Sequence, residues 1–447
     1  WPPPRSSRRS SASPRWLLAV IPPSRVRRRD LLRVAVRCDA GRQHFDEEGG
    51  VEPLRVRVEG EREARHLADA AVGSIRQLDG EGSIGLIGEE PYPSYDRPPL
   101  SKGLWRGDSV EDIWRNIQEQ SVEVHLGLRA QLLEPQNRRL TDERGEVYTF
   151  EKLLLATGGR PRRLPFGEDH IIYFRTLEDY HKLRTLAEQG RRFAVIGGGF
   201  VGSEIAAALA MNGKEVVMLF PKEAIGSHAF PADLARFLNG FYREKGVEVL
   251  ARETVSGLET HTERLDVRTS SGQEITVDGV IAGIGIEPDV RLAEGAGLEV
   301  GDGIVVDEFL RTTSPDVYAA GDVANFYNPD LDKRLRVEHE DNANTMGLLA
   351  GRNMAGAAEP YHHLPFFYSD LFELGYEAVG EVDARLETVA DWKDLGREGV
   401  VYYLREGQVR GVLLWNVWGQ VDAARRLIAE PGPFEADDLK GRLPEAQ

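Results

Sequence analysis

The chain has 447 residues, of which 41% are hydrophobic and 29% charged, and its formal net charge is −17. This length allows about two to four domains, and the acidic balance argues against nucleic acid and anionic membranes as partners. No apolar run approaches the roughly 20 residues of a spanning helix, so we expect no membrane span. The single cysteine, Cys38, permits neither an intrachain disulfide nor a Cys-x-x-Cys pair and favours a reducing, cytoplasmic location.

Residues 1–53 predict a basic leader without stable structure. They are rich in Pro, Ser and Arg, and no acidic residue precedes Asp30. Leaders of this composition can be organellar transit peptides, which keeps a mitochondrial location as the alternative. We favour a disordered extension with no targeting role.

A β–α–β unit is expected next, with strands at 54–58 and 84–87 and a helix at 64–78. Glu89 follows the second strand, where a carboxylate can accept a hydrogen bond from an adenosine ribose. The turn at 59–63 contains one glycine and three glutamates. These glutamates would place negative charge where the phosphates of a dinucleotide belong. The unit therefore has the outline of a dinucleotide-binding fold but lacks its phosphate loop.

The stretch 91–105 predicts an ordered loop, because its prolines exclude a helix. This loop carries Arg97 and Lys102. Strands are expected after it at 122–126, 130–133, 146–150 and 152–156.

The strongest local signal is a glycine-rich turn in the middle of the chain. An apolar strand, the spacing G-x-G-x-x-G, a helix and a second strand occur in that order, at 193–196, Gly197, Gly199, Gly202, 203–211 and 216–220. The glycines allow a tight turn, close approach to a pyrophosphate and close helix–strand packing. The helix N-terminus supplies N–H groups and partial positive charge for the anion. We therefore predict a dinucleotide site here.

The last part of the chain changes pattern. Short antiparallel strands are expected at 376–381, 400–405 and 411–415, with a helix near 421–428. This order predicts a separate α+β domain from about residue 361 onward.

Several short motifs join these units. They are Ala156-Thr-Gly-Gly159, Gly283-Ile-Gly-Ile-Glu-Pro288, Asp316-Val-Tyr-Ala-Ala-Gly-Asp322, Arg97-Pro-Pro-Leu-Ser-Lys102, Val337-Glu-His-Glu-Asp341 and Phe367-Tyr-Ser-Asp370. Together they resemble the FAD-dependent pyridine-nucleotide oxidoreductases, in the branch of apoptosis-inducing factor and the ferredoxin-reductase-like enzymes, and are closest to apoptosis-inducing factor.

The resemblance implies an α/β chain with two Rossmann-like dinucleotide-binding domains, one for FAD and one for NAD(P)H, plus a C-terminal α+β domain. The implied boundaries are 54–163 with 288–362 for the FAD domain, 164–287 for the NAD(P)H domain and 363–447 for the C-terminal domain.

The resemblance also implies a catalytic set of Lys102, Glu204 and His339. In the family the lysine and the glutamate meet beside flavin N5, where the ammonium stabilises the reduced ring and the carboxylate fixes the lysine. From the residues alone, Lys102 is a loop lysine and Glu204 an ordinary acid in a first helical turn. The positions that match FAD contacts are Glu89, Glu90, Arg97, Lys102, Ala130, Ala156, Thr157, Gly158, Arg175, Asp322, His339, Glu340 and Tyr368.

The positions that match NAD(P)H contacts include the whole glycine-rich turn. They are Gly197, Gly198, Gly199, Phe200, Val201, Gly202, Lys222, Glu223, Gly285, Glu338, Glu377 and Asn416. Lys222 stands about 20 residues past Gly202, where a lysine could favour the 2′-phosphate of NADPH and the adjacent Glu223 could restore NADH. Since the family branch mostly uses NADH, we expect NADH to be preferred. We expect no metal site, because His362 and His363 lack further ligands at useful spacing.

The implied reaction moves a hydride from NADH to FAD and then passes electrons to a quinone, oxygen or another acceptor. One alternative is a reductase of a ferredoxin or rubredoxin, against which the net acidity weighs. Another is a slow-turnover, NADH-responsive flavoprotein that changes partner docking. The partner is accordingly a small-molecule or protein electron acceptor, and a homodimer is suggested by analogy only.

One departure from the family pattern concerns FAD itself, because the phosphate loop expected before Asp69 is missing. Either FAD binding is weakened or the N-terminal segment is damaged, for example by a reading-frame slip. We favour the second explanation, since every later FAD position is intact.

Overall fold

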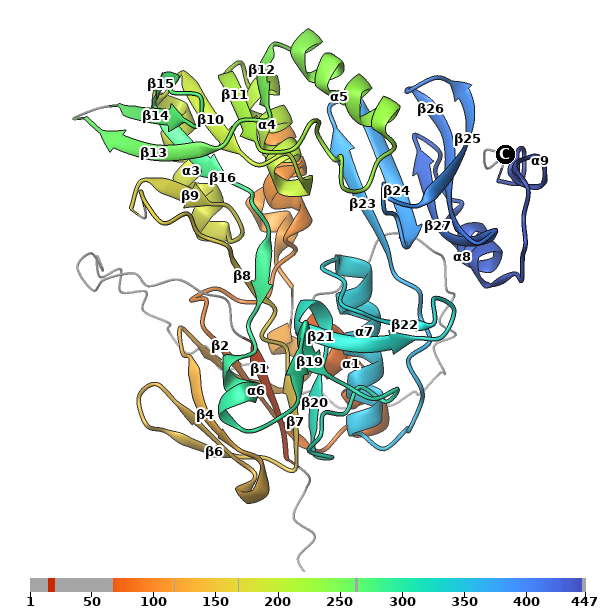
Figure 1. The fold of residues 1–447 in the computed structure, drawn as a ribbon. Coiled ribbons are helices and arrows are strands. Elements are labelled where there is room, and N and C mark those ends of the chain that lie inside the picture. Colours follow the sequence, from red (N-terminus) through yellow and green to blue (C-terminus); the bar gives the residue numbers. More distant parts are fainter. Residues whose placement is uncertain (1–14, 21–66, 116, 168, 262–263, 444–447) are drawn as a thin grey trace, which may run out of the picture.

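A parallel sheet of five strands forms the centre of the first domain in the computed structural model, which describes residues 15–20, 67–115, 117–167, 169–261 and 264–443 (Figure 1). The strand order is β20-β7-β1-β2-β3, and every neighbouring pair is parallel. The bounds are Arg15–Val20 for β1, Ser83–Gly88 for β2, Val122–Leu126 for β3, Lys152–Leu155 for β7 and Val317–Ala319 for β20.

The expectation that residues 1–53 form an unstructured leader is wrong for Arg15–Val20, because this segment forms strand β1. It lies between β2 and β7, with Leu18 fully buried. The strand predicted at 54–58 and the turn at 59–63 lie outside the described residues. The run Arg15-Trp-Leu-Leu-Ala-Val20 is mostly apolar, but it stands among prolines and arginines whose composition is typical of a segment without stable structure, so the pattern did not predict a strand.

Two helices of this domain pack closely against each other. Helix α1 spans Leu67–Leu78 and helix α7 spans Glu340–Met354. A Cβ atom added to Gly347 would lie 2.4 Å from the carbonyl oxygen of Leu67, and one added to Gly351 would lie 2.3 Å from that of Ala71. The two glycines are four residues apart on one face of α7, so they set the distance between the helices.

Smaller elements complete the first domain. One antiparallel sheet contains β4 (Ala130–Glu134), β5 (Arg139–Asp142) and β6 (Val147–Thr149). A mixed sheet, in which only β19 and β21 pair in parallel, contains β18 (Val300–Gly301), β19 (Gly303–Val305), β21 (Ala324–Asn328) and β22 (Lys333–Leu335). The short helices are α2 (Gly103–Arg106) and α6 (Arg291–Gly295).

The second domain contains another parallel sheet, in the order β12-β11-β10-β16-β9. Its elements are β9 (Ile171–Tyr173), α3 (Leu177–Gln189), β10 (Arg192–Ile196), α4 (Phe200–Met211), β11 (Glu215–Phe220), α5 (Ala232–Glu244), β12 (Val247–Ala251) and β16 (Gly279–Ala282), with an antiparallel sheet of β13 (Val255–Thr260), β14 (Leu265–Thr269) and β15 (Glu274–Val277). Strands β8 (Gly159–Pro161) and β17 (Ile286–Pro288) pair as the ribbon between the two domains (Figure 1).

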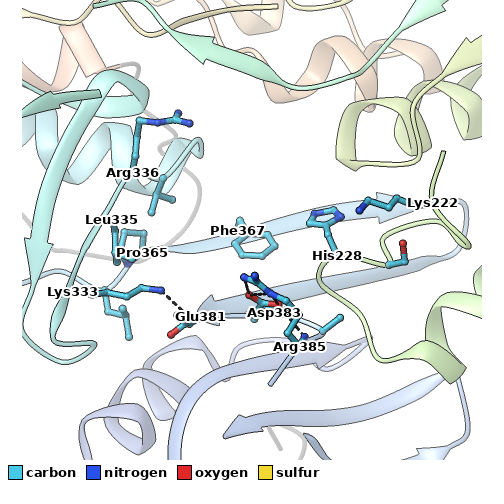
Figure 2. Close-up of a pocket in the computed structure, with 16 residues that line it drawn as sticks. Lys222, His228, Lys333, Leu335, Arg336, Pro365, Phe367, Glu381, Asp383 and Arg385 are labelled. Atoms are coloured by element: carbon cyan, nitrogen blue, oxygen red, sulfur yellow. Dashed lines mark hydrogen bonds and ion pairs between the residues drawn. The ribbon is translucent and has the colours of Figure 1, made fainter. Parts of the chain in front are cut away.

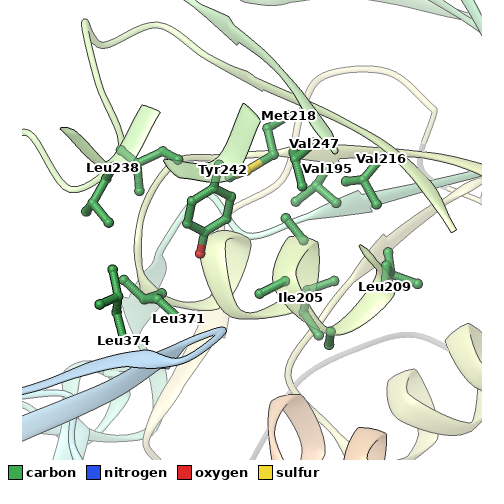
Figure 3. Packing of buried hydrophobic residues seen from close by; sticks show 14 of the residues in the cluster. Val195, Ile205, Leu209, Val216, Met218, Leu238, Tyr242, Val247, Leu371 and Leu374 are labelled. Carbon is green, nitrogen blue, oxygen red and sulfur yellow. The ribbon is translucent and has the colours of Figure 1, made fainter. Parts of the chain in front are cut away.

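The third domain is an antiparallel sheet in the order β23-β24-β27-β26-β25. Its elements are β23 (Phe366–Leu371), β24 (Leu374–Gly380), β25 (Glu387–Asp394), β26 (Glu398–Arg405), β27 (Gln408–Trp415), α8 (Val421–Ala429) and α9 (Ala436–Leu439). Its apolar side chains join the core of the second domain: Leu371 and Leu374 lie in the same cluster as Ile205 of α4 and Tyr242 of α5 (Figure 3). One hydrophobic cluster therefore spans the interface between the second and third domains, while each of these domains also has a cluster of its own.

Among the described residues, no helix is both long enough and apolar enough to cross a membrane. Nor do the described His, Cys, Asp and Glu side chains form a group that could hold a metal ion.

Candidate active site

The glycine-rich turn has the geometry that its spacing predicts. Gly197 has a φ of +120°, and a Cβ there would lie 2.3 Å from the carbonyl oxygen of Gly283. A Cβ on Gly202 would lie 2.2 Å from the carbonyl oxygen of Gly197. Helix α4 starts directly after Gly199, which as N-cap offers no side chain to the first-turn N–H groups. The turn therefore presents backbone N–H groups that can donate hydrogen bonds to a pyrophosphate.

The first two side chains of α4 are apolar and unusually open. Phe200 is 41% and Val201 36% exposed. The ring of Phe200 lies 5.2 Å from that of Phe367 and 5.7 Å from that of His228, between centroids. Apolar surface exposed beside a phosphate-binding turn is suited to contact with a flat ring system.

Glu204 connects all three domains. It is 5% exposed, and its carboxylate accepts hydrogen bonds from Lys102 Nζ at 2.7 Å, Ser101 Oγ at 2.6 Å and Ser369 Oγ at 2.6 Å. Ser101 ends the 3-10 turn 98–101 before α2, Lys102 is the N-cap of α2, and Ser369 lies on β23. Glu204 itself is the fifth residue of α4. Lys102 and Glu204 thus form a buried ion pair in which both carboxylate oxygens accept hydrogen bonds.

His339 lies at the N-terminus of α7, next to this ion pair. Burial lowers the pKa of His339 to about 4, and the Lys102 ammonium adds to the effect, so the ring is neutral at pH 7. Its Nδ1 faces the backbone N–H of Asp341 and its Nε2 that of Tyr368, both at 3.3 Å. A neutral imidazole has one acceptor nitrogen, so only one of these contacts is a hydrogen bond at a time.

Tyr368 and Glu340 lie beside His339. The Tyr368 ring meets the His339 ring edge-on at 5.0 Å, and Lys102 Nζ lies 5.3 Å from the Tyr368 centroid. The Tyr368 hydroxyl donates to Glu340 Oε2 at 3.2 Å. Burial, with Asp96 adding to it, raises the pKa of Glu340. These groups form one side of the space around Lys102.

A second group of the predicted residues gathers past the end of β2. Arg97 donates to Glu90 Oε1 at 2.5 Å and to the carbonyl of Arg175 at 3.0 Å. Glu89 pairs with Arg129, which precedes the buried Ala130, and burial raises the pKa of Glu89. Its Oε2 is buried and has no hydrogen-bond partner among the described residues.

A third group joins the first domain to the inter-domain ribbon. Thr157 Oγ1 donates to the carbonyl of Asp289 at 2.7 Å, and the N–H of Asp289 donates to the carbonyl of Gly158 at 2.9 Å. Arg175 Nη2 donates to Asp322 Oδ2 at 3.0 Å, while its buried Nε lacks a partner among the described groups. Gly158, at a φ of +57°, faces this guanidinium, and Ala156 directly follows β7.

Other predicted nucleotide residues occupy different surroundings. Asn416 accepts from Gly375 N–H at 2.7 Å and donates to the Arg397 carbonyl at 2.8 Å, so backbone groups engage both ends of its amide. Its predicted role at the nicotinamide is therefore not supported. Glu377 is the register partner of Tyr368, hence on the same sheet face, and its Oε2 is buried without a partner within the described chain.

Gly285 and Glu338 complete the predicted set. Gly285 has a φ of +91° and accepts from Arg162 N–H at 2.9 Å beside the ribbon. Glu338 receives a 2.6 Å hydrogen bond from Arg336, and burial raises its pKa. Lys222 and Glu223 follow β11. Lys222 lines a cleft between the domains, whereas Glu223 pairs with Arg252 outside it.

Sequence reasoning missed Ser101 and Ser369. Both belong to motifs quoted above, but a serine carries no charge or aromatic ring to single it out. Strand alternation could have placed Ser369 on the same face as Phe367 and Leu371. Only the packed structure shows that this face meets Glu204.

Comparison with known proteins decides the family. Residues 69–347 match the model for pyridine nucleotide-disulphide oxidoreductase, and 350–397 and 392–430 match the C-terminal domain of mitochondrion-associated apoptosis-inducing factor. The chain belongs to the pyridine nucleotide-disulphide oxidoreductase family. This oxidoreductase is 35% identical to the ferredoxin reductase subunit of 5,5′-dehydrodivanillate O-demethylase from Sphingobium, over 84% of this chain and 93% of that one.

Two further relatives place this oxidoreductase in the expected branch. Apoptosis-inducing factor 1 of Dictyostelium discoideum is 31% identical, over 88% of this chain and 81% of the relative. Putidaredoxin reductase, solved as a covalent complex with putidaredoxin, superposes with a TM-score of 0.78 at 28% identity, over 83% of this chain and 93% of that one. The protein is an FAD-dependent NAD(P)H oxidoreductase.

The described residues of the oxidoreductase fit FAD. The free oxygen of Glu89 lies past the carboxyl end of β2, where an adenosine ribose is held in this fold. Arg175, which pairs with Asp322, has an Nε without a partner among the described residues and can donate a hydrogen bond to the cofactor. Gly158, next to this guanidinium, has no side chain and a positive φ, so its backbone leaves room for a ligand. When bound, FAD supplies the chemistry that takes a hydride and releases electrons. The turn that would hold its pyrophosphate, within 21–66, lies outside the described residues.

Proposed function

We propose that this oxidoreductase transfers electrons from NAD(P)H to a ferredoxin-type iron–sulfur carrier. Reductases named for such carriers are similar to most of the chain. The ferredoxin–NAD(+) reductase component of the anthranilate 1,2-dioxygenase system from Burkholderia cepacia is 31% identical over 84% of this chain and 95% of its own length. The sequence has a single cysteine, so no internal disulfide can relay electrons. Reducing equivalents therefore leave directly from the FAD site.

The observation that carries the hydride-accepting part is the position of Glu204. It lies in α4 two residues after Gly202, so the carboxylate that binds the Lys102 ammonium directly follows the phosphate-binding glycines along the chain. A nucleotide held by this turn extends toward Lys102 along the open face of Phe200. Glu204 orients the lysine, and the aromatic rings of Phe200 and Phe367 exclude water from that side.

A second candidate is direct transfer to a quinone or oxygen. The C-terminal match to apoptosis-inducing factor favours it, as does the net charge of −17, which would repel an acidic carrier at long range. The slow-turnover, redox-sensing function remains a third prediction. A homodimer and a cytoplasmic location are also proposals, and sedimentation velocity tests the first of them.

Turnover with each acceptor distinguishes the candidates, measured without oxygen for ferredoxin and benzoquinone and in air-saturated buffer for oxygen itself. The flavin-loaded protein is mixed with NADH or NADPH, and cytochrome c reduction is measured with and without an added [2Fe–2S] ferredoxin. We expect ferredoxin to raise the rate strongly. Faster turnover with benzoquinone or oxygen than with ferredoxin would select the second candidate, and a long-lived reduced flavin with every acceptor would select the third.

A further inference from the structure

A basic cleft of about 630 Å³ opens where the three domains meet (Figure 2). Lys222, Ser227 and His228 line one side, from the loop after β11. Lys333 and Arg336 of the first domain line the opposite side, and Phe367 and residues 380–385 of the third domain complete it.

This cleft is continuous with the glycine-rich turn. The N–H of Gly226 donates to the carbonyl of Gly198 at 2.9 Å, which ties the loop after β11 to the turn. His228 lines both the cleft and a smaller cavity bordered by Gly198, Gly199 and Phe200. A nucleotide whose pyrophosphate lies on the turn can therefore extend its adenosine half toward His228 and Lys222.

Lys222 differs from the other cations of the cleft. Lys333 pairs with Glu381 at 2.8 Å, Arg336 with Glu338 at 2.6 Å, and Arg385 with Asp383. Within the part of the chain that the structure describes, Lys222 forms no ion pair, although it lines the cleft. It is thus an available positive charge two residues past β11, the strand end at which the nucleotide ribose is recognised in a Rossmann domain.

The neighbouring acid points elsewhere. Glu223 binds Arg252 Nη2 at 2.5 Å, past the end of β12, and it does not line the cleft. A carboxylate that accepts from the ribose 2′-hydroxyl selects NADH and repels a 2′-phosphate, whereas a cation there accepts the phosphate. Here the acid is turned away and the lysine is turned in.

We infer that Lys222, with His228 beside it, binds the 2′-phosphate of NADPH and that the protein prefers NADPH to NADH. This reverses the expectation drawn from the family branch. The inference depends on the NAD(P)H domain and not on which acceptor takes the electrons. Ser227 and His228 supply hydroxyl and imidazole groups next to the lysine, so a phosphate there finds more than one donor.

Binding of half-nucleotides tests this without any redox step. Isothermal titration of the flavin-loaded protein with 2′,5′-ADP and with 5′-AMP compares the two ligands. We expect 2′,5′-ADP to bind about tenfold more tightly or better, as charge-assisted hydrogen bonds allow. Lys222→Glu should abolish this advantage and leave 5′-AMP affinity nearly unchanged.

Two variants serve as controls. Lys182→Glu makes the same charge change on the exposed side of α3, where Lys182 lies 3.9 Å from Glu178, and should leave the 2′,5′-ADP preference intact. Glu223→Gln should change neither affinity. Equal affinity of the wild type for both ligands, a wild type that binds neither, or a loss of 5′-AMP binding in Glu223→Gln would each overturn the inference. Ferredoxin-dependent turnover, measured separately, decides the acceptor.

Discussion

Ser369 and Glu204 share a 2.6 Å hydrogen bond that joins β23 of the third domain to α4 of the second. The same Glu204 oxygen accepts from Lys102 of the first domain at 2.7 Å. The third domain therefore positions the lysine indirectly, through an acid that it holds in place.

Ser369→Ala should slow the reductive half-reaction without unfolding the protein. The variant removes one hydrogen bond to a buried carboxylate, and such bonds contribute about 1.5–3 kcal/mol, so we expect flavin reduction to slow by roughly tenfold or more. Stopped-flow bleaching of the flavin by NAD(P)H measures this. Ser256→Ala is the matched control, because it removes a hydroxyl on β13 that donates a hydrogen bond to the carbonyl of Arg268 on β14. An unchanged reduction rate would show that Ser369 does not position the pair.

Lys102→Met should destabilise the fold as well as impair turnover. It leaves the Glu204 carboxylate buried without its cation, which costs about 3–5 kcal/mol. Adding Glu204→Gln to the first change should recover much of the lost free energy of unfolding, because no unpaired charge remains. Urea denaturation of the two single variants and the double variant gives the coupling. Additive losses in the double variant would contradict the buried pair.

Gly202→Ala should weaken NAD(P)H binding while leaving the flavin content intact. The added Cβ would lie 2.2 Å from the carbonyl oxygen of Gly197, so the turn must shift. Overpacking of about 1–3 kcal/mol corresponds to roughly tenfold or more in affinity. Gly240→Ala is the control, since no heavy atom lies within 4 Å of its added Cβ and alanine favours a helix. Full NAD(P)H affinity in Gly202→Ala would remove the glycine-rich turn from the binding site.

His339 should make stability depend on pH. Its folded pKa of about 4 lies below the ordinary histidine pKa of 6.5, so between these two pH values the unfolded chain binds one more proton than the folded chain. Stability therefore falls as pH drops below about 6.5, by about 2 kcal/mol between pH 7 and pH 5. Urea denaturation of the wild type at both pH values, compared with His339→Gln, isolates this contribution from that of other groups. Equal pH slopes in the two proteins would show that His339 titrates normally.

Sequence patterns predicted the two nucleotide-binding domains but missed β1, the central strand of the first domain's sheet. The glycine-rich turn, its helix and its two strands were predicted within a few residues of α4, β10 and β11. Strand β1 was missed, because its partners β2 and β7 lie 68 and 136 residues further on in register. Strand pairing over such separations leaves no periodic signal near the strand itself.

The sequence by itself determined the nucleotide turn, because Gly197 and Gly202 act through the absence of a Cβ atom, which is a local property. Only the tertiary structure decided which polar groups meet. Ser101, Lys102 and Ser369 reach Glu204 from separate domains, and Lys222 rather than Glu223 lines the basic cleft. Hydrogen bonds of this kind depend on how the domains pack and on side-chain direction, which residue spacing along the chain does not specify.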